Sequence, residues 1–244
     1  MSETMTATGM LTGVGIGPGA VRYLTLEAVE ALRAADVIID VAGPRTKESV
    51  SERVIDELGG CAGERVHFVT PMSKDLAGRS EMWQQRAREV LDWIRAGKRL
   101  VYVTLGDPLI YSTFGYLRRE LLQLDPQVKI QVVPGITSFQ AAAARTGEPL
   151  LENEEVLSII PATASAAQQE AVLRGTDTAV FLKASRKKAA LFERVNGALD
   201  AQSFLYASRL ESPDELVATD PIQAAAMPDT YLSLFISRRQ NHDL

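Results

Sequence analysis

The amino-acid sequence is poor in cysteine, in histidine and in long apolar runs. Its single cysteine, Cys61, excludes an internal disulfide framework and a cysteine-based metal site. Since His67 and His242 are the only histidines, we predict no dedicated transition-metal site. No apolar run approaches the roughly 18 to 20 residues that span a bilayer, and the N-terminal stretch lacks the basic start and apolar segment of a signal peptide. We therefore expect a soluble, cytoplasmic protein that binds no membrane.

An excess of positive charge is absent as well. The net charge is −5, so the chain does not form the basic platform that nucleic-acid binding requires. An anionic small molecule would then have to be bound by local basic clusters, for which Arg45, Lys74 and Arg79 are the candidates. The same residues are also typical of an ordinary solvated surface.

What the sequence does contain is apolar material for a core, since 46% of its 244 residues are hydrophobic. Up to residue 124, short apolar segments alternate with segments of helical period, which predicts an α/β fold with a mainly parallel sheet. Beyond it the strand-like segments are more widely spaced, so we place a boundary there, between domains of residues 1–124 and 125–244. The expected strands cover residues 10–17, 36–42, 65–70, 99–106, 129–135, 156–162, 178–184, 203–209 and 230–239, and the expected helices cover 24–35, 48–58, 80–96, 114–124 and 137–146.

The first strand runs into a glycine-rich loop, "GVGIGPGA". Its Gly15-x-Gly17-x-x-Ala20 spacing satisfies a loose dinucleotide fingerprint, and Asp40 stands about where a ribose-binding acid belongs. Pyrophosphate binding, however, needs a helix to begin immediately after the glycines, and here Pro18 and further residues intervene before the expected N-cap, Thr25. The alternate glycines instead indicate an extended backbone that something bulky approaches closely.

Two further turns follow apolar strands. Asp107 lies in the Gly-Asp-Pro turn that ends "RLVYVTLG", and the "VVPGITS" segment places Thr137 and Ser138 before a helix of small residues. Ligands of α/β proteins bind at the carboxyl ends of parallel strands, so these side chains are candidates for holding a ligand. Helix capping is the other interpretation of the same residues.

Together these loops resemble the tetrapyrrole methylases, which use S-adenosylmethionine. The matching segments are "GVGIGPG" at 13–19 with "LT" at 24–25, "GDP" at 106–108 and "VPGITS" at 133–138. The finer pattern resembles the members that methylate C20 of precorrin-2 or cobalt-factor II, on "TPMSKD" at 70–75, "TLGDPLIYST" at 104–113, "IIPA" at 159–162, "VFLKASR" at 180–186, "YASR" at 206–209 and "YLSLFISRR" at 231–239. The chain departs from the family where Ala20 and Val21 follow the first Pro-Gly, and it matches only loosely at 41–49.

The resemblance implies two α/β domains with a cleft between them, a homodimer, and methyl transfer in corrin biosynthesis that releases S-adenosylhomocysteine. The donor-binding residues that it implies are Pro18, Leu105, Gly106, Asp107, Ile110, Thr137, Ser138, Leu182, Lys183 and Ser208. The anionic tetrapyrrole is expected to contact Tyr111, Arg45, Lys74 and Arg79, and no catalytic base is assigned. Three alternatives stay open: methylation of another ring carbon, an NAD-dependent dehydrogenase, and a binding module without catalysis.

Overall fold

The computed structural model describes residues 9–42, 49–69, 76–184, 188–199 and 203–239, and by its contacts the chain divides into two compact units. The first unit is Met1–Thr137 and the second is Ser138–Leu244. The division falls later than the expected residue 124 because β5 (Ile130–Val133) is hydrogen-bonded to β1 (Met10–Gly15) in the first sheet. Each unit is described below by itself.

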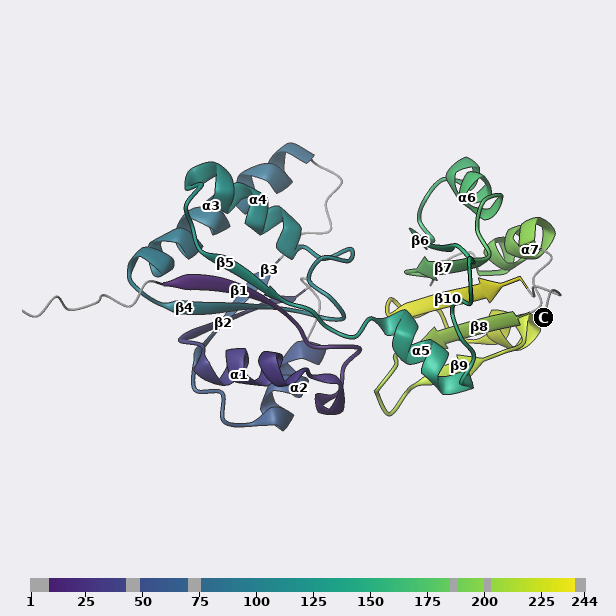
Figure 1. Cartoon of the computed structure of the whole chain (residues 1–244), viewed down its shortest axis with the longest axis horizontal. Coiled ribbons are helices and arrows are strands. Elements are labelled where there is room, and N and C mark those ends of the chain that lie inside the picture. The colour runs from purple at the N-terminus through teal and green to yellow at the C-terminus, as the bar shows by residue number, and fades with distance from the viewer. Residues whose placement is uncertain (1–8, 43–48, 70–75, 185–187, 200–202, 240–244) are drawn as a thin grey trace, which may run out of the picture. The chain divides into compact units, whose positions relative to one another are not determined.

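The first unit is a five-stranded sheet in which every pair of neighbouring strands is parallel, in the order β3-β2-β4-β1-β5. Its remaining strands are β2 (Val37–Ala42), β3 (Glu64–Val69) and β4 (Arg99–Thr104). Helices α1 (Leu26–Ala34) and α2 (Val50–Leu58) cover one face, and α3 (Leu76–Arg95) and α4 (Phe114–Leu124) cover the other (Figure 1). This arrangement confirms the predicted α/β class with a parallel sheet.

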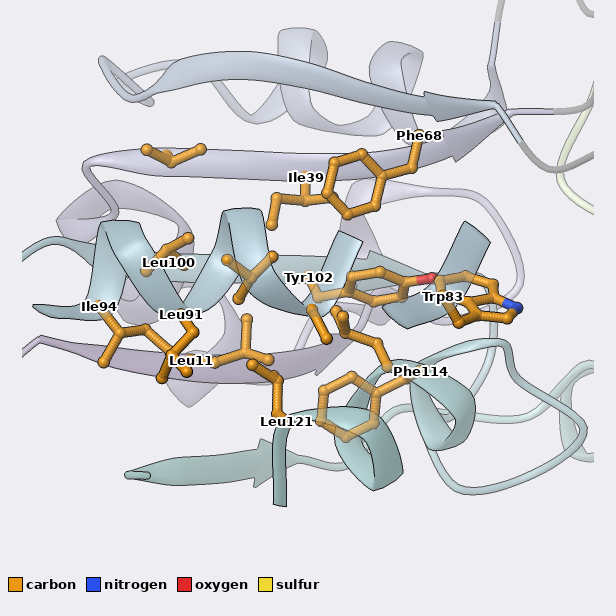
Figure 2. Packing of buried hydrophobic residues seen from close by; sticks show 14 residues of the cluster. Leu11, Ile39, Phe68, Trp83, Leu91, Ile94, Leu100, Tyr102, Phe114 and Leu121 are labelled. Carbon is orange, nitrogen blue, oxygen red and sulfur yellow. The ribbon is translucent and has the colours of Figure 1, made fainter. Parts of the chain in front are cut away.

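A core of apolar side chains lies between this sheet and α3 and α4 (Figure 2). Tyr102 of β4 is at its centre, fully buried and 5.7 Å from Phe114 between ring centroids. The Tyr102 phenol hydrogen-bonds Thr113 Oγ1 at 2.8 Å, and burial raises the pKa of Tyr102 far above its ordinary value. The same core residue therefore fixes both strand β4 and the start of α4, and so both ends of the loop between them.

The second unit is a mixed five-stranded sheet in the order β6-β7-β10-β8-β9. Its strands are β6 (Leu157–Pro161), β7 (Thr178–Leu182), β8 (Ser203–Ser208), β9 (Leu216–Ala218) and β10 (Ser233–Arg238). Its helices are α5 (Ser138–Thr146), α6 (Ala166–Leu173), α7 (Lys188–Leu199) and α8 (Pro221–Ala226). Side chains of α6, α7 and α8 form one apolar cluster with the sheet, whereas α5 contacts β8 and β10. Because β10 is antiparallel to both of its neighbours, β7 and β8 end at the same edge of the sheet, where β10 begins.

Within the part of the chain that the structure describes, no helix combines the length and the apolar character that crossing a membrane would need.

Candidate functional site

Three loops meet at the carboxyl ends of the neighbouring strands β4, β1 and β5. Each contributes one glycine, and the three backbones are in contact. A Cβ atom placed on Gly15 would lie 2.5 Å from the carbonyl oxygen of Gly106 and 2.6 Å from the amide nitrogen of Gly135, and a Cβ on Gly135 would overlap the same Gly106 oxygen. Any side chain at Gly15 or Gly135 would therefore push the loops apart.

This packing identifies the groups that closely approach the first glycine loop. The bulky groups that approach its glycines belong to the protein itself: the ring of Phe114 at Gly13, the other two loops at Gly15 and the Tyr23 side chain at Gly17. The glycines are needed for internal close packing, which the spacing along the sequence did not reveal.

The first glycine loop is tied to the Gly-Asp-Pro turn by a short antiparallel bridge. The amide of Gly106 donates to the Gly17 carbonyl at 2.7 Å, and the Gly17 amide donates to the Gly106 carbonyl at 3.4 Å. The 3₁₀ turn Val21–Tyr23 then precedes α1, whose N-cap Thr25 accepts a hydrogen bond from the Ala28 amide at 3.1 Å as predicted. Because the helix does not begin at the glycines, the loop lacks the anion-binding geometry of a dinucleotide site.

Asp40 also does not serve as a ribose-binding acid. Its side chain is buried on β2, where Oδ1 accepts a hydrogen bond from Ser51 Oγ at 2.5 Å in the first turn of α2. The dehydrogenase alternative thus finds no support in either of the features that suggested it.

Asp107 bridges two of the three loops. Its Oδ1 accepts a hydrogen bond from the Leu109 amide at 2.8 Å within its own turn, and its Oδ2 accepts one from the Gly135 amide at 3.1 Å. Both carboxylate oxygens therefore accept hydrogen bonds from the backbone. They hold the loop after β5, which contains Pro134 and Gly135 and is called the Pro-Gly loop below, against the Gly-Asp-Pro turn. Sequence reasoning assigned Asp107 to a ligand and missed this positioning contact, because the second amide is distant along the chain.

The loop between β4 and α4 exposes large apolar side chains. Leu105 is 37% exposed, Ile110 is 36%, Tyr111 is 52%, and Leu109, which the sequence analysis did not single out, is 66%. Tyr111 has a left-handed backbone with φ of 49°, a conformation that bulky residues rarely adopt. Exposed apolar surface on a strained loop at a strand end is typical of a ligand-binding surface.

Beside this loop, Gly106 has an open side. A Cβ there would meet nothing closer than the Thr137 Cα atom at 3.9 Å, although its φ of 69° disfavours a side chain. Pro18 is half-buried and Thr137 is buried. The structure thus brings Pro18, Leu105, Gly106, Asp107, Ile110 and Thr137 to one edge of the first sheet, whereas Ser138 is the first residue of α5 in the second unit.

In the second unit, the three remaining donor-site candidates lie at the edge where β7 and β8 end. Leu182 is half-buried and its carbonyl accepts the Ala162 amide at 2.7 Å, and Lys183 is exposed with φ of 61°. Ser208 is only 1% exposed, so its hydroxyl faces the interior and only its backbone is available to a ligand.

The Ser208 hydroxyl belongs to a buried polar group around the Tyr206 phenol. The hydroxyls of Thr230 and Ser233 complete it, and all three lie close enough to lower the pKa of Tyr206, although burial raises that pKa by more. Among the described residues, none of these four hydroxyls has a hydrogen-bond partner of good geometry.

The predicted substrate-binding cations are not placed by the structure. Arg45 and Lys74 lie outside the described residues, and Arg79 lies in α3 with its side chain outside them. Conversely, the structure reveals Arg209, which follows Ser208 directly and has φ of 49°. Arg209 belongs to the matching segment "YASR" but was given no role in the sequence analysis, since a backbone angle cannot be read from residue types alone.

Comparison with known proteins supports the same family. Residues 10–226 match the family model of the tetrapyrrole (corrin/porphyrin) methylases. The chain is 33% identical to the cobalt-precorrin-2 C(20)-methyltransferase of Salmonella typhimurium, over 72% of the chain and 73% of that protein. It is 31% identical to the precorrin-2 C(20)-methyltransferase of a Sinorhizobium species, over 73% and 74%. The crystal structure of a cobalt-precorrin-4 methyltransferase of cobalamin biosynthesis has the same fold, with a TM-score of 0.71 at 19% identity over 98% of each chain.

Proposed function

Because this chain belongs to the tetrapyrrole methylase family, we propose that it transfers a methyl group from S-adenosylmethionine to C20 of precorrin-2 or of cobalt-factor II. The observation that carries the proposal is the match of residues 10–226 to the family, together with identities above 30% to two C20-methyltransferases. The reaction belongs to the construction of the corrin ring.

The edge of the first sheet fits the methyl donor. A site for S-adenosylmethionine needs apolar side chains and backbone groups that can contact the ligand. The loop after β4 offers the exposed side chains of Leu105 and Ile110 beside the open face of Gly106. We propose that these residues contact the donor together with Pro18, Thr137 and Ser138, and that Asp107 acts by holding the loops in place. Leu182, Lys183 and Ser208 remain predictions from the family pattern, as donor contacts made through their backbone atoms.

Positioning is the main task of these residues. When bound, S-adenosylmethionine supplies a methyl group that is already activated on a sulfonium. The protein must hold the accepting carbon in line with that methyl, with the reacting atoms roughly 3 to 3.5 Å apart. Loops pinned by Asp107 and by three packed glycines provide a rigid support for this alignment. Tyr111, exposed on the same loop, is our candidate for contact with the face of the tetrapyrrole.

The substrate carries several carboxylates, which basic side chains must bind. Arg45, Lys74 and Arg79 stay predictions for this role.

The homodimer is also a prediction, which light scattering after size-exclusion chromatography tests.

Two experiments test the function. The enzyme is incubated with methyl-labelled S-adenosylmethionine and either precorrin-2 or cobalt-factor II, and NMR of the product locates the label. We expect it on C20; label on another carbon would leave the family assignment intact and refute the position. In a thermal-shift titration, S-adenosylhomocysteine should stabilise the protein and NAD should not, because a ligand stabilises the state that binds it. Stabilisation by NAD alone would revive the dehydrogenase.

A further inference from the structure

Two basic residues lie at one edge of the second sheet, each directly after the end of a strand. Lys183 follows the last residue of β7, and Arg209 follows the last residue of β8. Leu182 and Ala207 both lie opposite Leu234 of the intervening strand β10, so the two strands end nearly level. Since neighbouring strands are about 4.8 Å apart, the two strand ends are separated by roughly 10 Å.

Both residues have the left-handed backbone that long side chains rarely adopt. Their φ angles are 61° for Lys183 and 49° for Arg209. Hydrogen bonds to the start of β10 maintain the two turns: the Ala184 amide donates to the Ser233 carbonyl at 3.2 Å, and the Arg209 amide donates to the Leu232 carbonyl at 2.8 Å. Glycine or asparagine would adopt either turn with less strain, so the strained turns point to a use for the two long side chains.

The loop after Arg209 is itself rigidly held. Arg145 of α5 pairs with Glu211, whose side chain is only 1% exposed, and its Nε donates to Glu215 Oε1 at 2.7 Å. The Glu211 amide donates to Glu215 Oε2 at 2.7 Å. This clamp fixes the backbone from which the Arg209 side chain extends.

Charge at this edge is available to a ligand. The Arg209 side chain is 49% exposed, and its partner Asp214, at 2.9 Å, is 72% exposed, so water screens their ion pair. Lys183 is exposed and makes no ion pair with another residue in the described ranges. The nearby Asp229 pairs with the buried Lys188 at 3.5 Å and is thereby partly neutralised.

We propose that the side chains of Lys183 and Arg209 bind two carboxylates of the tetrapyrrole substrate. The inference rests on the proposed methyltransferase function and adds the residues that recognise the acidic substituents of the ring. A pair of cations roughly 10 Å apart on fixed backbone suits an anion with several carboxylates on a rigid frame. The methionyl carboxylate of the donor has the same chemistry, and the experiment separates the two sources.

The test uses Lys183→Asn and Arg209→Asn, because asparagine tolerates the left-handed backbone and removes the charge. Steady-state methylation should show a KM for the tetrapyrrole raised about tenfold in each variant, as expected for loss of one charge-assisted hydrogen bond. The donor contact predicted for Lys183 is made through its backbone, which asparagine keeps, so kcat and the dissociation constant of S-adenosylhomocysteine should stay as in the wild type. The tetrapyrrole KM should also depend less steeply on salt. Arg88→Asn, at an exposed position of α3, is the matched control and should change none of these quantities.

The glycine variants Lys183→Gly and Arg209→Gly guard against misfolding, since glycine fits the left-handed turn without strain. They should repeat the effect on KM, and the charge-retaining Arg209→Lys should recover much of it. An unchanged tetrapyrrole KM in the folded variants would overturn the inference, and so would weaker S-adenosylhomocysteine binding at unchanged KM, which would assign the cations to the donor. Failure of the wild type to methylate either tetrapyrrole would refute the proposed function instead.

Discussion

Because Asp107 contacts two backbone amides, replacing it tests whether this residue positions the donor-binding loops or contacts the donor directly. Replacing Asp107 with Ala removes the hydrogen bonds to the amides of Leu109 and Gly135. A hydrogen bond to a charged acceptor contributes about 1.5 to 3 kcal/mol when buried. Asp107 is half-buried and water can rebind the exposed Leu109 amide, so we expect the two together to contribute about 2 kcal/mol. That loss lowers Tm by roughly 4 to 8 °C for a chain of this size.

Urea denaturation measures the stability, and isothermal titration with S-adenosylhomocysteine measures the affinity. If Asp107 positions the loops, Asp107→Ala should lower both the stability and the affinity for S-adenosylhomocysteine. The affinity should fall about tenfold because the Pro-Gly loop is no longer held. Asp125→Ala is the control: Asp125 is also half-buried, accepts the Gln127 amide at 3.0 Å and lies near Arg95, at the end of α4. It should lose stability and keep the affinity. Lost affinity with unchanged stability in Asp107→Ala would refute the reasoning, since the carboxylate would then contact the donor directly.

Four further substitutions test the glycine packing and two polar contacts, with urea denaturation as the measurement. Gly135→Ala should lower the free energy of unfolding by about 3 kcal/mol because its Cβ would overlap backbone atoms. Gly115→Ala, with open space around it in α4, should instead raise the free energy of unfolding by about 0.5 to 1 kcal/mol. Equal effects of the two substitutions would contradict the packing described for Gly135. The side-chain hydrogen bond from Arg99 lowers the pKa of Asp36 below its ordinary value of 3.8. The pair therefore stabilises the fold fully at pH values above 3.8, and this contribution is lost as the pH falls through the lowered pKa. Because the pair is exposed, Asp36→Asn should lower the free energy of unfolding by less than about 1 kcal/mol at neutral pH. The variant should also lose stability less steeply as the solution becomes acidic, and an unchanged dependence on pH would contradict the role of this pair. Tyr206→Phe should change stability by less than about 1 kcal/mol, because the phenol has no hydrogen-bond partner of good geometry to lose; a cost above about 2 kcal/mol would show a strong bond there.

Local sequence patterns predicted the first unit well because each of its elements carries its own signal. The helix expected at 114–124 is α4 (Phe114–Leu124), and the N-cap expected at Thr25 is present. In the second unit the sequence analysis proposed no helix beyond residue 146, and it missed α6, α7, α8 and the short strand β9. A signal for α6 existed in the capping box of Ser165 and Gln168, but few of its residues are buried and its helical period is weak.

The candidate site was predictable in its location and not in its contacts. That the carboxyl ends of parallel strands would gather the loops follows from topology, and the loops do meet there. The reason for the glycines does not follow: Gly15 and Gly135 are far apart in sequence, and only the folded chain shows that each leaves room for the backbone of the other. The same holds for Asp107, whose carboxylate closes this junction through the Gly135 amide. A residue pattern that suggests close approach of a ligand can therefore arise from close approach of the chain to itself, and the ligand then binds to the rigid surface that this packing creates.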